Sequence, residues 1–296
     1  MHFDSILALT DLTAHSAHVL ERAALLAQHH QATLRLVHIA EGPNTLLADP
    51  LARLAQRARQ LKRHHEIPVH VVARSLPLKE ALAEASACTL LVMGALPHRS
   101  WKRFYLGNTL DQAIQGSPCP VLVVKQAPSQ AYAQVIVVDN LSTQSNSLID
   151  FAAVFAVPRV LKLFHASDII DKRKQQSDPP TLETHPAHRL SSRQQARNRL
   201  TELIHELAVA PPAPQDSAQA FDIHTTDWTT LDQRATQADL VVVGQRRRAL
   251  WTHVFTRSMA QCLAQSTSGD MLLVPMDLLN DAAMADKHCG DPHGPH

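Results

Sequence analysis

The sequence LLVMGALPHRSWKRFYLGNTLDQAIQGSPCPVLVVK, at residues 90–125, decides the fold of this chain because a diverged copy of it follows. The copy, LVVVGQRRRALWTHVFTRSMAQCLAQSTSGDMLLVPM, occupies residues 240–276 and keeps Gly244 opposite Gly94 and Trp251 opposite Trp101. A constant spacing across a whole block indicates duplication. Each copy runs from an apolar segment through a glycine and a basic loop into a helical segment and a second apolar segment. This order predicts a strand–loop–helix–strand unit whose loop can hold phosphate.

The beginning of each half is repeated as well. ILALTDLTAHS at residues 6–16 aligns with VIVVDNLSTQS at residues 135–145, and LVH at residues 36–38 aligns with LFH at residues 163–165. We therefore predict two homologous domains, at residues 1–127 and 132–277, followed by a disordered tail at residues 278–296. Polar, proline-bearing stretches between residues 167 and 220 are expected to be loops of the second domain.

Composition narrows the class of protein. A length of 296 residues favours two domains, and a net charge of +1 gives no reason to expect nucleic acid as a partner. No apolar run approaches the roughly 18 residues of a membrane span, and the start MHFDSILALTD does not resemble a signal peptide. The four cysteines form no CxxC pair, which is typical of a reducing compartment. We expect a cytoplasmic protein with no membrane contact.

The nineteen histidines raise the question of a metal site. His29 and His30, and likewise His64 and His65, are neighbours in the sequence. Adjacent side chains on a helix point about 100° apart, so we expect such pairs not to share an ion readily. A specific site also needs further ligands with oriented partners. We predict solvated histidines and no metal other than Mg²⁺ accompanying a bound nucleotide.

Apolar periodicity predicts alternating strands and helices in the first half. Short apolar runs predict strands at residues 6–10, 33–39, 69–73, 90–94 and 121–124. Helical spacing predicts helices at residues 16–29, 45–65, 78–87 and 109–115. This alternation predicts an α/β fold with a parallel sheet, right-handed crossovers and helices on both faces.

The motifs resemble those of the universal stress protein family, in particular its tandem two-domain members. The family pattern has an Asp after the first strand, then Gly-x2-Gly-x9-Gly-(Ser/Thr) after the fourth strand, and a last strand like PCPVLVV. The first half has Asp11, then Gly94-x2-Pro97-x9-Gly107-Asn108, and PCPVLVV at residues 118–124. The resemblance covers both halves. It implies two tandem doubly wound, Rossmann-like domains, each with a five-stranded parallel sheet of order 3-2-1-4-5.

The same resemblance implies a nucleotide site. In the order 3-2-1-4-5 the first and fourth strands are neighbours, and a crevice opens at their carboxyl ends. Family members that bind ATP place the base near the acidic residue and the phosphates at the glycine loop, where helix N-terminal amides favour an anion. The residues that match these positions here are Thr10, Asp11, Ile39, Met93, Gly94, Gly107, Asn108 and Thr109.

Several departures from the family pattern leave alternatives open. Pro97 replaces the second motif glycine and has no N–H to donate, whereas Asn108 can still cap a helix. Nearby Arg99, Lys102 and Arg103 either compensate at the phosphate or form a solvated basic loop. Asp11 alone could equally be a strand-end residue that caps the next turn.

The second half departs further. Gly244 and Ser258 are kept, but Arg247 and Arg257 stand where the second and third motif glycines are expected. Asn140 takes the place of the acidic residue unless the alignment shifts by one residue. We therefore predict that the second half does not bind ATP in the family manner. The loop at residues 246–248 is either an anion site or a solvated face.

No catalytic motif is present: the chain has no GxSxG, no Walker lysine loop and no HExxH. We predict a non-catalytic stress-response protein whose first domain binds ATP or another adenine nucleotide. The alternatives are an adaptor that acts through unknown protein partners with both pockets vestigial, and a weak nucleotide hydrolase.

The last strands, at residues 121–124 and 271–274, are apolar edges. We expect these strands to join the two domains as an intramolecular pseudo-dimer. The sequence leaves open whether the full chain also forms a higher oligomer.

Overall fold

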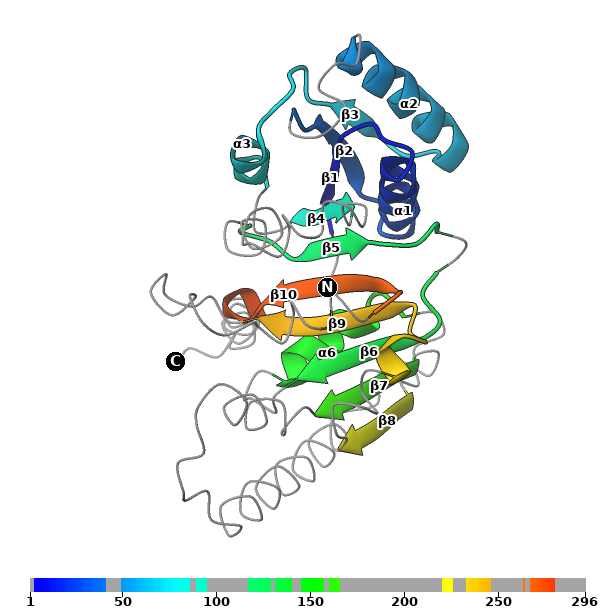
Figure 1. Ribbon diagram of the computed structural model, residues 1–296, viewed down its shortest axis with the longest axis vertical. Helices are drawn as coiled ribbons and strands as arrows, with labels where there is room; N and C mark the ends of the chain where they lie inside the picture. The colour runs from blue at the N-terminus through cyan, green and yellow to red at the C-terminus, as the bar shows by residue number, and fades with distance from the viewer. Residues whose placement is uncertain are drawn as a thin grey trace, which may run out of the picture. The chain divides into compact units, whose positions relative to one another are not determined.

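The computed structural model describes residues 3–40, 49–85, 89–94, 117–128, 131–139, 145–156, 160–165, 220–225, 233–245, 263 and 267–279. The chain forms two compact units (Figure 1). The first comprises the described residues up to Ala131 together with Gly269–Leu278. The second contains the described residues from Tyr132 to Gly244.

The first unit is built on one sheet with the strand order β3-β2-β1-β4-β5-β10. Its strands are β1 (Ser5–Thr10), β2 (Thr33–His38), β3 (Val69–Val71), β4 (Thr89–Gly94), β5 (Val121–Val124) and β10 (Asp270–Pro275). Neighbours from β3 to β5 are parallel, whereas β10 runs antiparallel to β5. The predicted α/β Rossmann-like fold and the order 3-2-1-4-5 are therefore confirmed for this part of the chain.

Helices cover both faces of this sheet. In Figure 1, α1 (Ser16–His29) and α2 (Pro50–His65) lie on one face, and α3 (Leu78–Ala83) lies on the other. The inner strands are apolar on both sides: residues 6–9 of β1, residues 90–93 of β4 and all four residues of β5 are buried. A strand buried on both faces needs an uninterrupted apolar run, which is the pattern the sequence shows. The predicted helix at residues 109–115 lies outside the described residues.

The bounds of α1 and β5 agree with the sequence prediction, and those of β1, β2 and β4 differ by one residue. Larger differences occur in α2, in β3, and in α3, which ends at Ala83 and not at the predicted residue 87. The described part of α2 begins at Pro50, where the Asp49 side chain accepts a hydrogen bond from the Ala52 amide at 3.0 Å. Proline at the first helical position and Asp at the N-cap both favour a helix start here. β3 has three residues instead of the predicted five. Its ladder to β2 ends at the pair Leu36–Val71.

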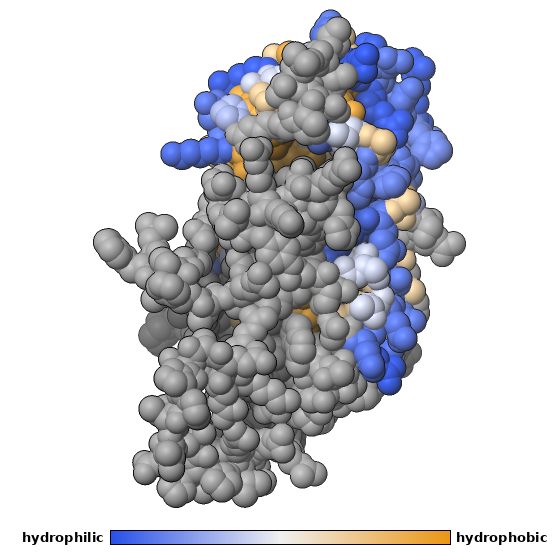
Figure 2. All heavy atoms as spheres, in the orientation of Figure 1, coloured by the Kyte–Doolittle hydropathy of each residue, from blue (hydrophilic) through white to orange (hydrophobic). Residues whose placement is uncertain are grey.

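α2 is amphipathic and strongly basic. Leu54, Ala58, Leu61 and His65 are buried on one face. The opposite face is hydrophilic in Figure 2 and carries the exposed cations Arg53, Arg59, Lys62 and Arg63.

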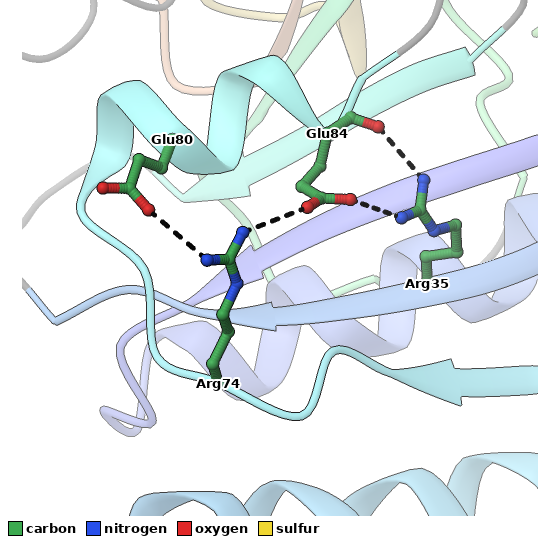
Figure 3. Close-up of polar contacts among 4 residues, drawn as sticks. All are labelled: Arg35, Arg74, Glu80 and Glu84. Carbon is green, nitrogen blue, oxygen red and sulfur yellow. Dashed lines mark hydrogen bonds and ion pairs between the residues drawn. The ribbon is translucent and has the colours of Figure 1, made fainter.

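Arg35, on β2, and Arg74, in the segment between β3 and α3, contact α3 and the residue that follows it (Figure 3). Arg35, on β2, donates from Nη1 to the Glu84 carbonyl at 3.0 Å and from Nη2 to the Glu84 carboxylate at 2.7 Å. Arg74 lies between Glu80 and Glu84, with nitrogen–oxygen distances of 3.9 and 3.8 Å. The two-point contact of Arg35 fixes the end of α3 over β2, because a guanidinium that bonds twice also sets orientation.

β10 is attached to the first unit by a buried carboxylate as well as by its ladder to β5. Asp270 is 1% exposed, and its Oδ1 accepts hydrogen bonds from the amides of Lys125 and Gln126 at 2.8 and 3.2 Å. Its Oδ2 lies 3.3 Å from Nε of Arg22, whose side chain is 8% exposed. The carboxylate thus links the first residue of β10 to the end of β5 and to α1.

The second unit contains a parallel sheet of order β9-β6-β7-β8. Its elements are β6 (Val135–Asp139), α6 (Ser145–Ala153), β7 (Val160–His165), β8 (Ala220–Thr225) and β9 (Leu240–Gln245). Registers match those of the first unit: Ile6 faces Leu90 and Ala8 faces Val92 there, while Val135 faces Leu240 and Val137 faces Val242 here. At the start of this sheet the Asp239 carboxylate accepts the amides of Ala133 and Gln134 at 3.0 and 2.8 Å.

Residues 276–279 are helical, so the described chain remains ordered two residues into the predicted tail. Residues 280–296, the rest of that predicted tail, lie outside the described residues. In the part of the chain that the structure describes, none of the helices combines the length and the apolar character that crossing a bilayer requires.

Candidate functional site

The candidate site lies where β1 and β4 end side by side. The two strands pair in parallel up to Ala8 and Val92, and two residues further along they end at Thr10 and Gly94. β1 has β2 on one side and β4 on the other, so this edge is the point where the strand order changes direction. In open α/β sheets, ligands bind outside the carboxyl ends of the strands at such a point.

Hydroxyl groups hold the turn from β1 into α1. Thr10 is 2% exposed, and its hydroxyl donates to Oγ of Ser16 at 2.9 Å while accepting the Leu12 amide at 3.0 Å. Ser16 in turn donates to the Thr13 carbonyl at 2.8 Å. Leu12 has a φ of 58°, an uncommon conformation for a residue with a side chain. Thr10 is predicted to line the base, and in the structure its hydroxyl stabilises this strained turn.

Asp11 has the capping role, one of the two roles that the sequence left open. Its Oδ1 accepts from the amide and the hydroxyl of Thr13, at 3.1 and 2.7 Å, which is the capping role. Its Oδ2 makes no hydrogen bond within the described residues, and the side chain is half-buried. The cap thus holds the carboxylate by one oxygen, and the other oxygen stays available to accept a hydrogen bond from a ligand.

The residues predicted to line the base differ in accessibility. The Ile39 amide donates to the Thr10 carbonyl at 2.9 Å, and Ile39 is half-buried, so an apolar side chain lies beside Thr10 with part of its surface open. Met93 is 5% exposed and belongs mainly to the core. Gly107, Asn108 and Thr109, like Pro97 and the neighbouring cations Arg99, Lys102 and Arg103, lie outside the described residues.

Packing favours a glycine at position 94. A Cβ atom on Gly94 would lie 3.0 Å from Cγ2 of Val19 and 3.4 Å from Cδ2 of His15. These residues belong to the start of α1, which therefore approaches the end of β4 closely. Nε2 of His15 is shielded from solvent and has no hydrogen-bond partner among the described residues.

His38 is a residue at this edge that the sequence analysis did not select. It is paired with Thr10 in the β1–β2 ladder, is 5% exposed, and has its Nδ1 2.8 Å from Oγ of Ser75. Burial lowers the pKa of His38 from its ordinary value, and the negative charge of Asp11 opposes this shift. The imidazole is therefore held in its neutral form more strongly than a solvated histidine. The sequence signal that could have identified His38 is the repeat of LVH at residues 36–38 as LFH at residues 163–165.

Comparison with known proteins identifies this part of the chain. Residues 2–125 match the sequence model of the universal stress protein family. Residues 2–125 are a universal stress protein domain. No curated protein matches the chain at a significant level.

Two solved structures share the fold of the chain. A functionally unknown protein from Pseudomonas aeruginosa PAO1 is 20% identical, and the alignment covers 96% of this chain and 98% of that one with a TM-score of 0.62. A universal stress protein from Archaeoglobus fulgidus DSM 4304 is 14% identical, with 92% and 96% of the two chains covered and a TM-score of 0.62.

The corresponding edge of the second unit is only partly described. In the β6–β7 ladder Asp139 faces His165, as Thr10 faces His38 in the universal stress protein domain. Asp139 therefore occupies the position of Thr10, and the residue in the place of Asp11 is Asn140. The register therefore excludes the alternative alignment, shifted by one residue, in which Asp139 would take the place of Asp11. Asn140, Arg246, Arg247, Arg248, Arg257 and Ser258 lie outside the described residues.

Proposed function

We propose that the universal stress protein domain binds ATP or another adenine nucleotide at the carboxyl ends of β1 and β4. The observation that carries this proposal is the free Oδ2 of Asp11 at the change of strand order. The half-buried Ile39 beside Thr10 adds an apolar surface suited to a base. Gly107, Asn108 and Thr109 are proposed to receive the phosphates, with Mg²⁺ present only as a companion of the nucleotide.

We further propose that the protein acts in the stress response without catalysing a reaction. Membership of residues 2–125 in the universal stress protein family supports that role. The matching registers of the two sheets support a second domain of the same kind, and Asn140 in place of the acidic residue supports its loss of ATP binding. The intramolecular pseudo-dimer stays a prediction from the apolar last strands at residues 121–124 and 271–274. The lack of a CxxC pair among the four cysteines supports a reducing compartment such as the cytoplasm.

Nucleotide binding is tested by ATP titration of the full chain and of two matched variants. Asp11→Asn keeps Oδ1 as the acceptor of the Thr13 cap but removes the negative charge. Loss of a hydrogen bond to a charged group costs about 1.5–3 kcal/mol, so we expect the affinity to fall about tenfold to a hundredfold. Asp49→Asn, at the exposed N-cap of α2, is the control, because Asn caps a helix as well as Asp does.

Each alternative function has its own outcome in this experiment. Equal affinity of wild type and Asp11→Asn would place the nucleotide elsewhere. Failure of the wild-type chain to bind ATP would favour the adaptor with vestigial pockets. Release of inorganic phosphate from bound ATP by the wild-type protein would establish the hydrolase and contradict the non-catalytic proposal.

A further inference from the structure

Two pairs of adjacent histidines occupy equivalent places in the first unit. His29 and His30 stand at the end of α1, and His64 and His65 at the end of α2. In both pairs the first histidine is exposed, the second is buried, and the rings are nearly perpendicular, at 87°. The ring centroids are 5.0 Å apart in the first pair and 4.7 Å apart in the second. Local geometry therefore does not distinguish the two pairs.

A carboxylate distinguishes them. Glu21, on α1, places Oε1 2.8 Å from Nε2 of His65. One ligand atom each of Glu21, His64 and His65 lie within 4.8 Å of one another, which among the described residues is the one group of three metal-ligating side chains. The ring of His30 instead packs against the edge of Phe3, with centroids 4.9 Å apart. The two rings diverge as expected, but Glu21 from the neighbouring helix brings a third ligand atom within 4.8 Å of both.

The donor set selects a class of ion. Two imidazoles and one carboxylate form the three-ligand set that zinc uses when it keeps a fourth position open. Metal–ligand distances of about 2.0–2.2 Å require the three ligand atoms to move closer together. His64 is exposed, so its ring can turn toward the other two, and the His65–Glu21 hydrogen bond gives way to bonds with the ion. Imidazole nitrogen favours zinc, nickel or copper over magnesium or calcium.

Some of the surrounding charges favour a bound cation at this group, and others oppose it. The negative end of the α2 dipole lies at His64 and His65, which favours a cation there. Nη2 of Arg57 lies 4.0 Å from Oε2 of Glu21, and its charge opposes a second cation there. Solvent reaches the group through an open hollow of about 640 Å³ lined by Glu21, Arg57, Gln60, Leu61, Arg63 and His64. Water can therefore fill the fourth position.

We propose that Glu21, His64 and His65 form a binding site for a divalent ion of the zinc class, which joins α1 to α2. The ion would replace one hydrogen bond between the helices with three bonds to a common centre. The site is independent of the proposed nucleotide pocket, because none of its ligands lies at the carboxyl ends of β1 and β4.

The test is a zinc titration of the full chain in competition with a chromogenic chelator. Other histidines and cysteines add background, so the readout is the difference between variants. His64→Ala and Glu21→Gln should each remove one equivalent of bound zinc or weaken it by more than about tenfold, the size of effect produced by losing even an outer partner of a ligand. His29→Ala is the matched control, since it removes the exposed member of the pair that belongs to no group of three metal-ligating side chains among the described residues. It should leave the zinc stoichiometry and affinity unchanged.

Thermal unfolding provides the second measurement. Zinc should raise the unfolding temperature of the wild type and of His29→Ala, because an ion that binds only the folded state stabilises it. It should not raise that of His64→Ala, whose metal-free stability stays unchanged because the side chain is exposed. Equal zinc stoichiometry and affinity in the wild type and His64→Ala would overturn the site. An equal loss in His29→Ala and His64→Ala would overturn it as well.

Discussion

Asp270 provides the sharpest test of how β10 is held in the first unit. Asp270→Asn keeps an oxygen that can accept the amides of Lys125 and Gln126 but removes the charge opposite Arg22. The carboxylate is 1% exposed and the Arg22 side chain 8% exposed, so water does not replace the lost partner readily. Removing one member of a buried ion pair costs about 3–5 kcal/mol. We expect about 3 kcal/mol, the lower end, because Arg22 has further interactions.

Hydrogen exchange of the full chain measures this loss of stability at the β5–β10 ladder itself. A loss of about 3 kcal/mol corresponds to roughly a hundredfold faster exchange of amides that open together with the β5–β10 ladder. The peptide that covers residues 121–126 reports on that ladder and on both amides bonded to Asp270. Urea unfolding of the same proteins gives the free energy independently.

An exposed ion pair serves as the control. Glu80→Gln removes the contact with Arg74, in which the two side chains are 55% and 65% exposed, and such pairs contribute about 0–1 kcal/mol. Replacing both Arg22 and Asp270, as Arg22→Met with Asp270→Asn, should cost less than Asp270→Asn alone, since no buried charge then loses its partner. If Asp270→Asn changed exchange and unfolding no more than Glu80→Gln does, the buried pair would not be what fastens β10.

Two further predictions concern the same unit. Gly94→Ala should destabilise the protein by about 1–2 kcal/mol in urea unfolding, because the new methyl group would meet Val19 at 3.0 Å. Combination with Val19→Ala should cost less than the sum of the two changes, and strict additivity would exclude the close contact. Burial lowers the pKa of Lys125 from 10.5 to about 8, so between about pH 8 and 10.5 the unfolded chain binds more protons than the folded one and stability should rise with pH. Lys125→Met should remove that rise from the urea midpoints, and parallel pH profiles of variant and wild type would contradict the shift.

Local sequence was sufficient for those parts of the fold that depend on local burial. The bounds of α1 and β5 follow from apolar periodicity, since a residue's face on a helix or strand is set by its neighbours in the chain. The Asp11 cap was also predictable, because Asp bonds the backbone two residues further on wherever such a turn forms. The family motif then placed Asp11 and Gly94 at one edge of the sheet.

Contacts between distant segments were decided by tertiary structure alone. Periodicity shows that residues 271–274 are buried, but not that β10 runs antiparallel to β5 or that Asp270 faces Arg22. Gly94 was predicted as a ligand residue, and only the structure shows that the close approach of Val19 also favours a glycine there. The physical reason is that a sequence pattern records how much of a side chain is buried, whereas a partner from another element is fixed only when the elements pack. Glu21 is 44 residues from His65 in the chain, and only the packing of α1 against α2 brings the two within hydrogen-bonding distance.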